Sequence, residues 1–568
     1  MEIKKWIFEA IPNADVIDEL SSAINVNAVL CQILIQRGIT HFDQAKDFFR
    51  PELDQLNDPF SMKDMDVAVK RIQTAIKNKE HILVYGDYDV DGTTSVAMMH
   101  SFLTSIHPKV SYYIPDRYAE GYGISTQGID YAVEQNCSLI ISLDCGIKAV
   151  DKIAYANQKK IDFIICDHHL PGEHLPEAIA VLDPKRKDCQ YPFKELSGCG
   201  VGFKLIQAYC IQNDIAEHRA FEFLDLVSVS IAADIVPVTG ENRILAFYGL
   251  EKINFNPRPG IKALLEVSGL KGKITISHLV FQLGPKINAA GRIDHAHLAV
   301  KLLAAINEDE ATIIASQISD KNNRRKDFDQ NITLQALNKI ASDETLKLAK
   351  ATVLFQEDWH KGVIGIVASR CIEHYHRPTI ILTESNGLAT GSARSVKGFD
   401  IHAAIESCAE LLSQFGGHTH AAGLTLPIEN ITAFTEKFNT IVNSTITEEQ
   451  LQAKVHIDAY VCLDQITERF YHILSQMDPF GPGNMQPVFA ARNLELFETP
   501  RILKDQHLKI IVKDKNGKQN LHAIGFGLAH FKDQLETAES FELAFTIQEN
   551  EYNGYKSLQL YLKDIRFE

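Results

Sequence analysis

The sequence predicts an α/β protein with a parallel-sheet domain, a long connecting helix, a second and smaller α/β domain, and a C-terminal β-barrel. Three observations support this fold class. Short apolar runs alternate with helical stretches from about residue 76 to about residue 295, which is typical of βαβ units. Residues 292–361 contain neither glycine nor proline, the two residues that most disfavour a helix interior. From about residue 445 onward, short strands alternate with turn signals.

The first region, residues 1–75, is predicted to be mainly helical, with Pro51 interrupting it and residues 72–76 leading into the first strand. No run of 18 apolar residues occurs, and Met1–Trp6 lacks the apolar stretch of a signal peptide. We therefore expect a cytoplasmic protein with no membrane partner. With 568 residues, of which 45% are hydrophobic, the chain is long enough for about four domains.

Three carboxylates at every second position follow the first apolar run of the predicted sheet. The run His81–Gly86 leads into Asp87, Asp89 and Asp91. If the strand continues, this spacing puts the three side chains on one face, where they repel one another unless a cation lies among them. Carboxylate oxygens suit Mg²⁺ and Mn²⁺. The motif therefore predicts a metal site.

An EF-hand loop also begins D-x-D-x-D-G, so it is the main alternative for this motif. Its twelfth position would be Met98, where a bidentate glutamate is required. The segment before Asp87 is also strand-like rather than helical. These two departures exclude the EF-hand, and a solvated acidic turn is the simpler alternative that stays open for this motif alone.

Later apolar runs end in similar residues. Runs at 138–143, 161–166 and 178–182 are followed by Asp144, by Asp167-His168-His169 and by Asp183, respectively. Singly, such an aspartate is more often a helix N-cap and such a histidine a surface or core residue. Functional residues of parallel sheets gather at the carboxyl ends of the strands, so we expect these side chains to converge. An Asp and His cluster without cysteine favours Mn²⁺ or Mg²⁺ over structural zinc.

These motifs carry a resemblance to a known family. Their order resembles that of the DHH phosphoesterase superfamily, whose motifs correspond to Asp87–Gly92, Asp144–Gly146, Asp167–His169 and Ala232–Pro237. Four further motifs resemble the RecJ single-strand exonuclease branch: Gly284–Arg292, Trp359–Arg370, Gly391–Ser395 and Gly416–Gly423. The first domain then corresponds to a DHH catalytic domain, the second to a DHH-associated domain, and the barrel to an OB-like domain.

The resemblance implies which residues act at the metal site. The implied metal ligands are Asp89, Asp91, Asp144, His168 and Asp234, with Asp87 at or just beyond the coordination sphere. Asp89 and Asp91 would also be catalytic, together with His169, which would face the scissile phosphate. Two divalent cations, Mn²⁺ or Mg²⁺, roughly 3.5–4 Å apart can activate water and stabilise a leaving oxygen. Val90 departs from the smaller residue of many relatives, but we expect its side chain to point away from the acids.

The resemblance also implies substrate-binding residues, namely Arg117, Asn288, Arg292, Ser392, Arg394 and His418. We expect the glycine-rich motifs around 391–395 and 416–423 to let backbone amides approach phosphate, although such clusters are usually turns. In the barrel, the candidates for binding a strand are Lys504, Lys509, His522, Phe526 and Tyr555. The apolar ones among these are alternatively core residues.

The remaining elements follow from composition. A helix from Asn307 to Asp343 would be about 50 Å long, enough to join two domains across a cleft. Residues 351–355 and 379–382 are predicted strands of the smaller domain, and Asn516 and Asn553 lie in signals for tight hairpins of the barrel. The predicted domains are residues 1–75, 76–295, 296–345, 346–444 and 445–568.

The formal charge of −16 is unusual for a nucleic-acid enzyme, because basic residues normally contact the phosphates. Basic residues do occur in groups, at 185–187, at 321–326 and at Lys504, Lys509 and Lys513. Each group alone is most simply a solvated face. A basic groove on an otherwise acidic protein is the functional alternative.

The sequence therefore predicts a metal-dependent exonuclease that degrades single-stranded DNA from its 5′ end in DNA repair and recombination. By family resemblance, its partners would be single-stranded DNA, a single-strand-binding protein and a helicase. One alternative is a DHH phosphodiesterase of short oligonucleotides or cyclic dinucleotides, which would need neither the long helix nor the barrel. The other is a strand-binding factor without catalysis.

Overall fold

The computed structural model describes residues 4–117, 119–293, 296–515, 517–552 and 554–567. The chain forms two compact units. The larger unit comprises residues 10–322 and 458–561, and the smaller unit comprises residues 1–9, 323–457 and 562–568. The α/β fold class predicted from the sequence is confirmed. The five domain boundaries stay a prediction.

The larger unit contains a five-stranded, fully parallel sheet. Its strands are β2 (His81–Gly86), β3 (Val110–Tyr113), β4 (Cys137–Leu143), β5 (Asp162–Cys166) and β6 (Ala180–Leu182), in the order β3-β2-β4-β5-β6. The sequence predicted all of them except β3, which is a short edge strand of half-buried residues. The strand order reverses between β2 and β4. In sheets of this kind the ligand site lies at that reversal, outside the carboxyl ends of the strands.

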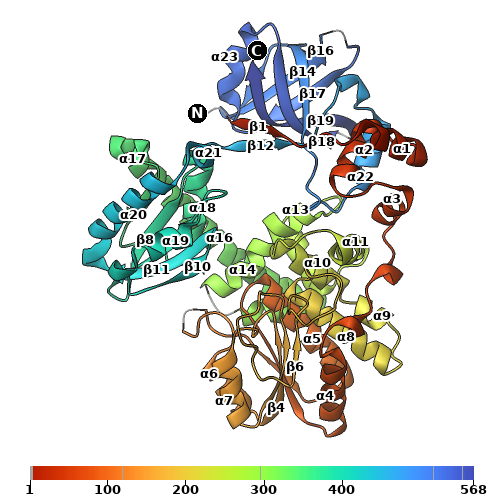
Figure 1. Cartoon of the computed structure of the whole chain (residues 1–568), viewed down its shortest axis with the longest axis vertical. Helices are drawn as coiled ribbons and strands as arrows, with labels where there is room; N and C mark the ends of the chain where they lie inside the picture. Colours follow the sequence, from red (N-terminus) through yellow and green to blue (C-terminus); the bar gives the residue numbers. More distant parts are fainter. Residues whose placement is uncertain (1–3, 118, 294–295, 516, 553, 568) are drawn as a thin grey trace. The chain divides into compact units, whose positions relative to one another are not determined.

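Helices cover both faces of this sheet. The face with α6 (Thr126–Glu134) and α7 (Val150–Gln158) is opposite the face with α4 (Met65–Lys77), α5 (Val90–Ile106) and α8 (Gly198–Gln212), as Figure 1 shows. Strand β2 alternates accordingly, since Leu83 and Tyr85 pack toward α6 while Ile82 and Val84 pack toward α5. Further helices follow: α9 (His218–Phe221), α10 (Leu224–Ala233), α11 (Gly240–Phe255), α12 (Pro259–Val267), α13 (Ile276–His278), α14 (Gly284–Ile293) and α15 (His297–Leu303).

The N-terminal region is mainly helical, as predicted, with α1 (Ala14–Ile24), α2 (Ala28–Gln36) and α3 (Phe42–Phe49). The prediction missed β1 (Lys5–Phe8). This strand belongs to the smaller unit and pairs in parallel with β12 (Lys454–Ile457). A four-residue strand whose partner is so distant in sequence leaves no local periodic signal.

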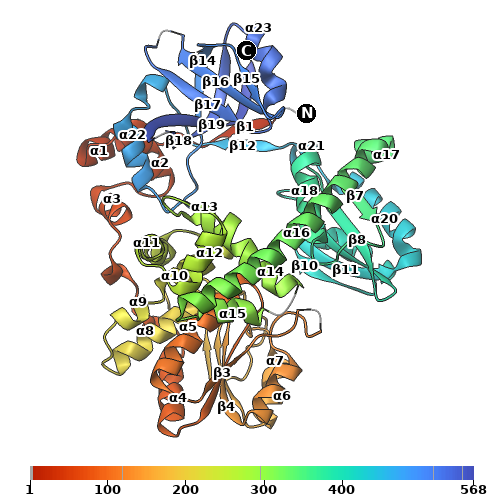
Figure 2. The same ribbon diagram turned by 180° about the vertical axis from the view of Figure 1, so that it is seen from behind.

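The C-terminal part of the larger unit contains the predicted β-barrel (Figure 2). Its strands are β13 (Ala459–Tyr460), β14 (Phe489–Leu496), β15 (Arg501–Leu503), β16 (His507–Asp514), β17 (Asn520–Gly525), β18 (Phe541–Tyr552) and β19 (Tyr555–Phe567), of which β19 runs into the smaller unit from residue 562 onward. An additional pairing between β14 and β16 closes the sheet. The hairpin residues Asn516 and Asn553 lie outside the described residues. Helices α22 (Glu468–Gln476) and α23 (Lys532–Thr537) accompany the strands.

The loop at 477–485, which lies between β13 and β14 of the barrel, is bound to α11. The Arg243 guanidinium, which is buried, donates to the carbonyl oxygens of Met477, Asp478 and Pro479. It also donates to Phe48 O. In addition, Val238 N donates to Pro482 O at 2.7 Å. The Arg243 side chain therefore joins α11 to Phe48 and to the loop at 477–485, although these segments are far apart in the sequence.

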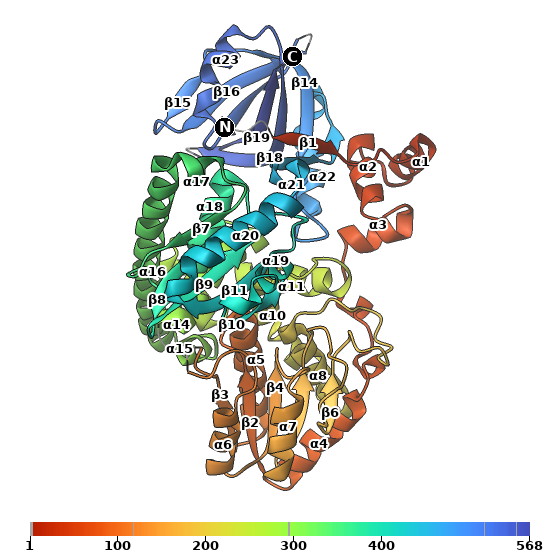
Figure 3. The same ribbon diagram turned by 60° about the vertical axis from the view of Figure 1, so that its left-hand side comes forward.

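The smaller unit has a five-stranded sheet in the order β10-β11-β9-β8-β7. Its strands are β7 (Thr352–Phe355), β8 (Thr379–Ser385), β9 (Leu388–Arg394), β10 (Gln414–His418) and β11 (Ala421–Pro427). Helices α19 (Ile401–Glu406) and α20 (Ile431–Thr445) cover one face (Figure 3), and α18 (Ile364–Tyr375) covers the other. The glycine-rich motifs at 391–395 and 416–423 therefore contribute strands, with Ser392 paired to Gly423, and are not simple turns.

The predicted long helix is present as α16 (Glu308–Ser342), which has 35 residues. Asn307 caps it, because its side chain accepts hydrogen bonds from the backbone N–H groups of Asp309 and Glu310. Two short helices, α17 (Glu344–Leu348) and α21 (Glu448–Leu451), complete the smaller unit. Within the described part of the chain, every helix is too short or too polar to cross a lipid bilayer.

Candidate metal centre

The acidic motif after β2 does not continue the strand. The strand ends at Gly86, Asp89 is the N-cap of α5, and Asp91 lies in the first turn of that helix. The Asp89 side chain accepts a hydrogen bond from Gly92 N at 2.9 Å. The strand-face argument for this motif was therefore wrong. Aspartates are favoured at a helix N-cap and in its first turn, and this preference decides the local structure.

Two neighbours of the acids behave as the chain geometry requires. Val90 is buried in the core, so its side chain points away from the acids, as expected. Gly92 approaches Asp87 so closely that a Cβ atom would lie 2.3 Å from Asp87 O. The loop can therefore turn from β2 into α5 only with glycine at this position.

Asp91 is the most firmly held carboxylate of the site. Its Oδ2 accepts from Gly198 N at 2.7 Å, and its Oδ1 accepts from Cys199 N at 2.8 Å and from Ser230 Oγ at 2.7 Å. Gly198 and Cys199 form the first turn of α8, where the positive end of the helix dipole favours an anion. This role of α8 was not predicted from the sequence, although Ser197 is a typical N-cap residue and marks the start of the helix.

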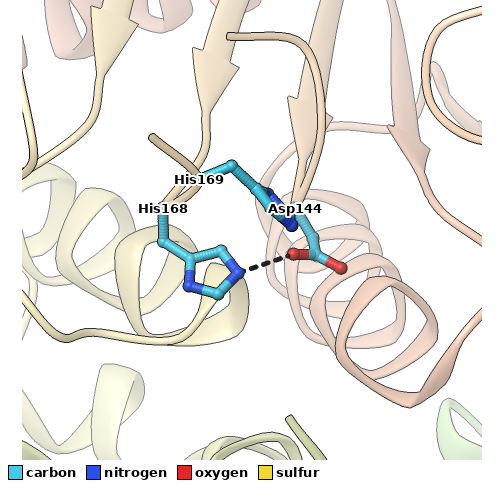
Figure 4. Close-up of side chains that lie close together, drawn as sticks. All are labelled: Asp144, His168 and His169. Atoms are coloured by element: carbon cyan, nitrogen blue, oxygen red, sulfur yellow. Dashed lines mark ion pairs between the residues drawn. The ribbon is translucent and has the colours of Figure 1, made fainter. Parts of the chain in front are cut away.

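Asp91, Asp144 and Asp234 converge on His168. The His168 Nε2 atom lies 3.1 Å from Asp144 Oδ1, 3.5 Å from Asp234 Oδ2 and 3.9 Å from Asp91 Oδ2. Figure 4 shows the Asp144 carboxylate and the His168 ring pointing toward each other. Asp144 follows β4, His168 follows β5 and Asp234 ends α10. Residues from all four motifs of the DHH resemblance thus meet at the edge of the sheet where the sequence predicted the site.

The backbone at Asp144 is unusual. Its φ of 61° lies in the left-handed region, which a residue with a Cβ atom adopts at a cost. A Cβ atom on Gly198 would lie 2.7 Å from Asp144 Oδ1. The absence of a side chain at Gly198 therefore lets α8 begin directly against this carboxylate.

His169 is oriented by Asp167, which was not among the predicted site residues. The His169 Nδ1 atom lies 2.7 Å from Asp167 Oδ1, and its Nε2 lies 3.1 Å from the Tyr122 hydroxyl. Asp167 Oδ1 also accepts from His168 N at 2.7 Å. The motif contained Asp167, but only the structure shows that this acid holds the His169 ring and the His168 backbone rather than joining the cluster of converging side chains.

The acids of the centre are unfavourable neighbours without a cation. Burial and then the charge of Asp89 raise the pKa of Asp87 to about 8. Burial and then the charges of Asp91 and Asp89 raise the pKa of Asp234 to about 8 and that of Asp144 far above its usual range. Burial, followed by the charge of Asp91, also raises the pKa of Asp89. A bound cation would reverse this repulsion.

The pKa values of the two histidines are shifted in opposite directions. Burial lowers the pKa of His168, so the neutral ring with a free lone pair is favoured. Burial would also lower the pKa of His169, but the hydrogen bond to Asp167 and the charge of Asp167 outweigh it and raise that pKa. The same contacts outweigh the effect of burial on Asp167 and lower its pKa. His168 thus suits a metal ligand, and His169 suits a contact with an anion.

The donor set fits hard divalent cations. Two groups of three residues could each hold an ion, because the ligand atoms within each group lie within 4.8 Å of one another. One group is Asp144, His168 and His169, and the other is Asp91, His168 and Asp234. Asp144 Oδ1 and both ring nitrogens of His168 are buried without a hydrogen-bond partner among the described residues. Buried polar atoms normally have partners, so a cation is the expected partner here. Asp87 and Asp89 lie beside these groups rather than within them.

The predicted substrate-binding residues lie in different parts of the chain. In the larger unit, Arg117 lies over the Tyr88 ring, 5.1 Å from its centroid, and Asn288 is half-buried on α14. The Arg292 side chain lies outside the described residues. The smaller unit contains Ser392, Arg394 and His418.

In the smaller unit, the side chains of Ser392 and Arg394 meet. The Arg394 Nη1 atom donates to Ser392 Oγ at 3.0 Å. A Cβ atom on Gly365 would lie 2.8 Å from Ser392 Oγ and 2.9 Å from Arg394 Nη2, so both side chains lie against the first turn of α18. His418 is exposed near the end of β10, and the register places both Arg394 and His418 opposite Ala421.

In the barrel, the predicted strand-binding aromatics are exposed and are not core residues. Phe526 is 58% exposed and Tyr555 is 82% exposed. His522 and Lys509 point away from the core on β17 and β16, which pair with each other. Lys504 lies in the turn after β15, with a φ of 49°.

The parallel sheet with an Asp and His cluster at its strand reversal lies in the part of the chain that matches the DHH family. The DHH family N-terminal domain matches residues 81–231, the DHHA1 domain matches residues 347–444, and the RecJ OB domain matches residues 457–564.

Individual relatives narrow the class. The chain is 34% identical over 560 residues to the single-stranded-DNA-specific exonuclease RecJ of Bacillus subtilis, covering 97% of this chain and 70% of that protein. It is 33% identical to the Escherichia coli RecJ exonuclease, covering 89% and 90% of the two chains. The crystal structure of Thermus thermophilus RecJ with Mn²⁺ matches with a TM-score of 0.84 and 25% identity, over 99% of this chain and 79% of that one. The chain belongs to the RecJ family.

Proposed function

We propose that this chain is a metal-dependent exonuclease that hydrolyses phosphodiester bonds of single-stranded DNA in the 5′ to 3′ direction, in DNA repair and recombination. The observation that carries the proposal is the convergence of Asp91, Asp144 and Asp234 on His168, whose pKa is lowered by burial. Membership of the RecJ family supports the substrate class. RecJ of Thermus thermophilus has been crystallised with Mn²⁺ and with Mg²⁺, which supports the same cations here.

The proposed ligands of two divalent cations are Asp89, Asp91, Asp144, His168 and Asp234, with Asp87 adjoining them. When bound, such ions activate a water molecule and stabilise the leaving oxygen. The chain's own contribution is to fix the ligands. The amides of α8 and Ser230 Oγ orient Asp91, and burial keeps His168 neutral, as metal ligation requires.

His169 has a separate role in the proposal. Asp167 holds its Nδ1 atom, which stabilises the protonated ring and leaves Nε2 directed at the Tyr122 hydroxyl. A fixed cationic donor of this kind stabilises negative charge that develops on a phosphate. His169 is therefore proposed to contact the scissile phosphate.

The 5′ polarity rests on the smaller unit. Ser392 and Arg394 lie against the first turn of α18 and bring a hydroxyl and a guanidinium together, and this pair suits a terminal phosphate. Arg117, Asn288, Arg292 and His418 are proposed as further substrate contacts. On the barrel, Lys509, His522 and Phe526 are proposed to bind the strand through charge and base stacking, with Lys504 and Tyr555 as additional contacts.

The decisive experiment is digestion of end-labelled DNA, single- and double-stranded, with Mg²⁺ or Mn²⁺ added separately. We expect mononucleotides or short products from the 5′ end of single strands, and no product in a chelator. Preferential hydrolysis of cyclic dinucleotides would favour the small-substrate phosphodiesterase instead. Tight binding without any product would favour a strand-binding factor. A single-strand-binding protein and a helicase as partners, and a cytoplasmic location, are part of the same proposal.

A further inference from the structure

Lys185 is a basic residue at the same edge of the sheet as the metal centre, and the function proposed above does not use it. It follows β6, while His168 follows the neighbouring strand β5. The two strand ends are joined directly, because Asp167 N donates to Leu182 O at 3.0 Å. The turn that carries Lys185 therefore lies beside the segment that carries both histidines.

This turn is held firmly by its own residues. Lys185 N donates to Asp183 Oδ1 at 2.7 Å, and Asp183 is buried. The neighbouring Arg186 is buried as well, and its guanidinium forms ion pairs with Asp64 and Asp188 at 2.6 and 2.7 Å. Because the residues on both sides are fixed, the backbone position of Lys185 is fixed as well. The lysine side chain has several rotatable bonds, so its ammonium group can change partner.

The ammonium group lies between segments that position the ligands. Its one ion pair among the described residues is with Glu195 Oε2, at a distance of 3.6 Å. Glu195 directly precedes the turn that starts α8 and binds Asp91. The Asn242 side chain donates to both Glu195 O and Pro237 O, which fixes Glu195 next to the segment after Asp234.

The electrostatic effect of Lys185 is consistent with this position. Burial is the largest influence on both His168 and Asp234; the positive charge of Lys185 adds to the lowering of the pKa of His168 and opposes the rise of the pKa of Asp234. The Lys185 side chain is 20% exposed, so solvent and a ligand can reach it. Its partner Glu195 is 47% exposed, and ion pairs that open to water are weak.

We propose that Lys185 is a phosphate-binding residue, which leaves Glu195 and contacts a non-bridging oxygen of the DNA strand beside the scissile phosphate. The inference rests on the function proposed above. Glu195 then holds the ammonium in place when no strand is bound and competes with phosphate for it. The basic residues at 185–187 therefore have different roles in this proposal. Lys187 is exposed, has no ion pair in the part of the chain that the structure describes, and is not proposed to bind phosphate.

The test compares Lys185→Gln with its matched control Lys187→Gln, in the full chain with Mn²⁺ or Mg²⁺ and a labelled single strand. We expect Lys185→Gln to raise KM about tenfold with little change in kcat, as for one lost hydrogen bond to a charged group. The slope of log(kcat/KM) against log[salt] should become shallower by about 0.7, the value for one phosphate contact on a single strand. Lys187→Gln should change neither quantity.

Two further variants separate contact from structure. Lys185→Arg should restore KM and the salt slope, because it keeps the charge. Glu195→Gln should lower KM about two- to threefold, since it removes the competing carboxylate, and this arm remains informative if Lys185→Gln folds poorly. The inference would be overturned if Lys185→Gln had the same KM and salt slope as Lys187→Gln, or if Glu195→Gln raised KM. If the wild-type chain degrades no single strand with either cation, the proposed function itself fails, which is a distinguishable result.

Discussion

The Asp167 carboxylate aligns His169. Its Oδ1 lies 2.7 Å from His169 Nδ1 and also accepts hydrogen bonds from the backbone N–H groups of His168 and His169. Its Oδ2 accepts Ile147 N at 2.9 Å. One buried side chain therefore fixes the backbone of both histidines and the ring of His169, whose Nε2 faces the Tyr122 hydroxyl.

Asp167→Asn should lower kcat about 10- to 100-fold, the range found when partners of metal-site histidines are changed. The amide cannot stabilise a protonated His169 or keep its ring in one orientation. The measurement is steady-state cleavage of a labelled single strand at saturating metal. Asp162→Asn, at the opposite end of the same strand, is the matched control and should retain kcat. Equal activity in the two variants would contradict the role of Asp167.

Asp89→Ala, Asp144→Ala and His168→Ala should each reduce cleavage on the order of a thousandfold or more, because functional groups that act as a unit fail together. Circular dichroism should show an intact fold, and affinity for single-stranded DNA should be largely kept, because barrel and smaller-unit contacts remain. Near-normal turnover in any one folded variant would remove that residue from the ligand set.

Arg394→Ala should erode the preference for 5′-phosphorylated over 5′-hydroxyl strands about tenfold, since it removes a charge-assisted contact with phosphate. Rates on the two strands are measured with the same enzyme, so folding differences cancel. Arg370→Ala, on α18 of the same unit and paired with Glu373, should leave the preference unchanged. Arg292→Ala is expected to act like Arg394→Ala. Trimming from the 3′ end of a strand with a blocked 5′ end would reverse the polarity.

Glu80 lies far from the metal centre, and its lowered pKa should make the free energy of unfolding depend on pH in the acid range. Burial alone would raise its pKa, but hydrogen bonds from Ser138, Arg71 and Asn78 outweigh burial and lower it. A carboxylate with a lowered pKa stabilises the fold above its unfolded pKa of about 4.3. This contribution is lost as the pH falls through the lower folded value.

Glu80→Gln should therefore reduce the free energy of unfolding by about 1–2 kcal/mol at neutral pH. The difference from wild type should shrink as the pH falls below about 4. Urea unfolding of the full chain at several pH values, in a chelator, measures both effects. The exposed Glu134→Gln is the control and should match wild type throughout. A difference that grows in acid would show that the sign of the pKa shift is wrong.

The strand ends of the catalytic sheet could be predicted because β4 and β5 are continuous apolar runs with an acid directly after them. Asp144 and His168 followed from this pattern. The position of Asp91 could not, because the same three-acid spacing fits a strand and a capped helix start equally well. Only contacts with α8, more than a hundred residues later in the chain, decide between them.

Other differences have similar causes. Strand β3 has no apolar run because it lies at the sheet edge and is half-buried, and β1 depends on a partner near residue 455. The glycines of β9–β11 indicate turns by composition, yet they are paired in a sheet. Tertiary pairing overrides local preference in each case.

The Arg243 contacts with the loop at 477–485 have a consequence for how the barrel would act on a long strand. A module on a flexible tether raises the local concentration of its ligand by an amount that falls with tether length. Here backbone carbonyls bound to one buried guanidinium replace the tether. We therefore expect single strands that are too short to reach both the barrel and Asp234 to lose the benefit of the barrel in one step rather than gradually.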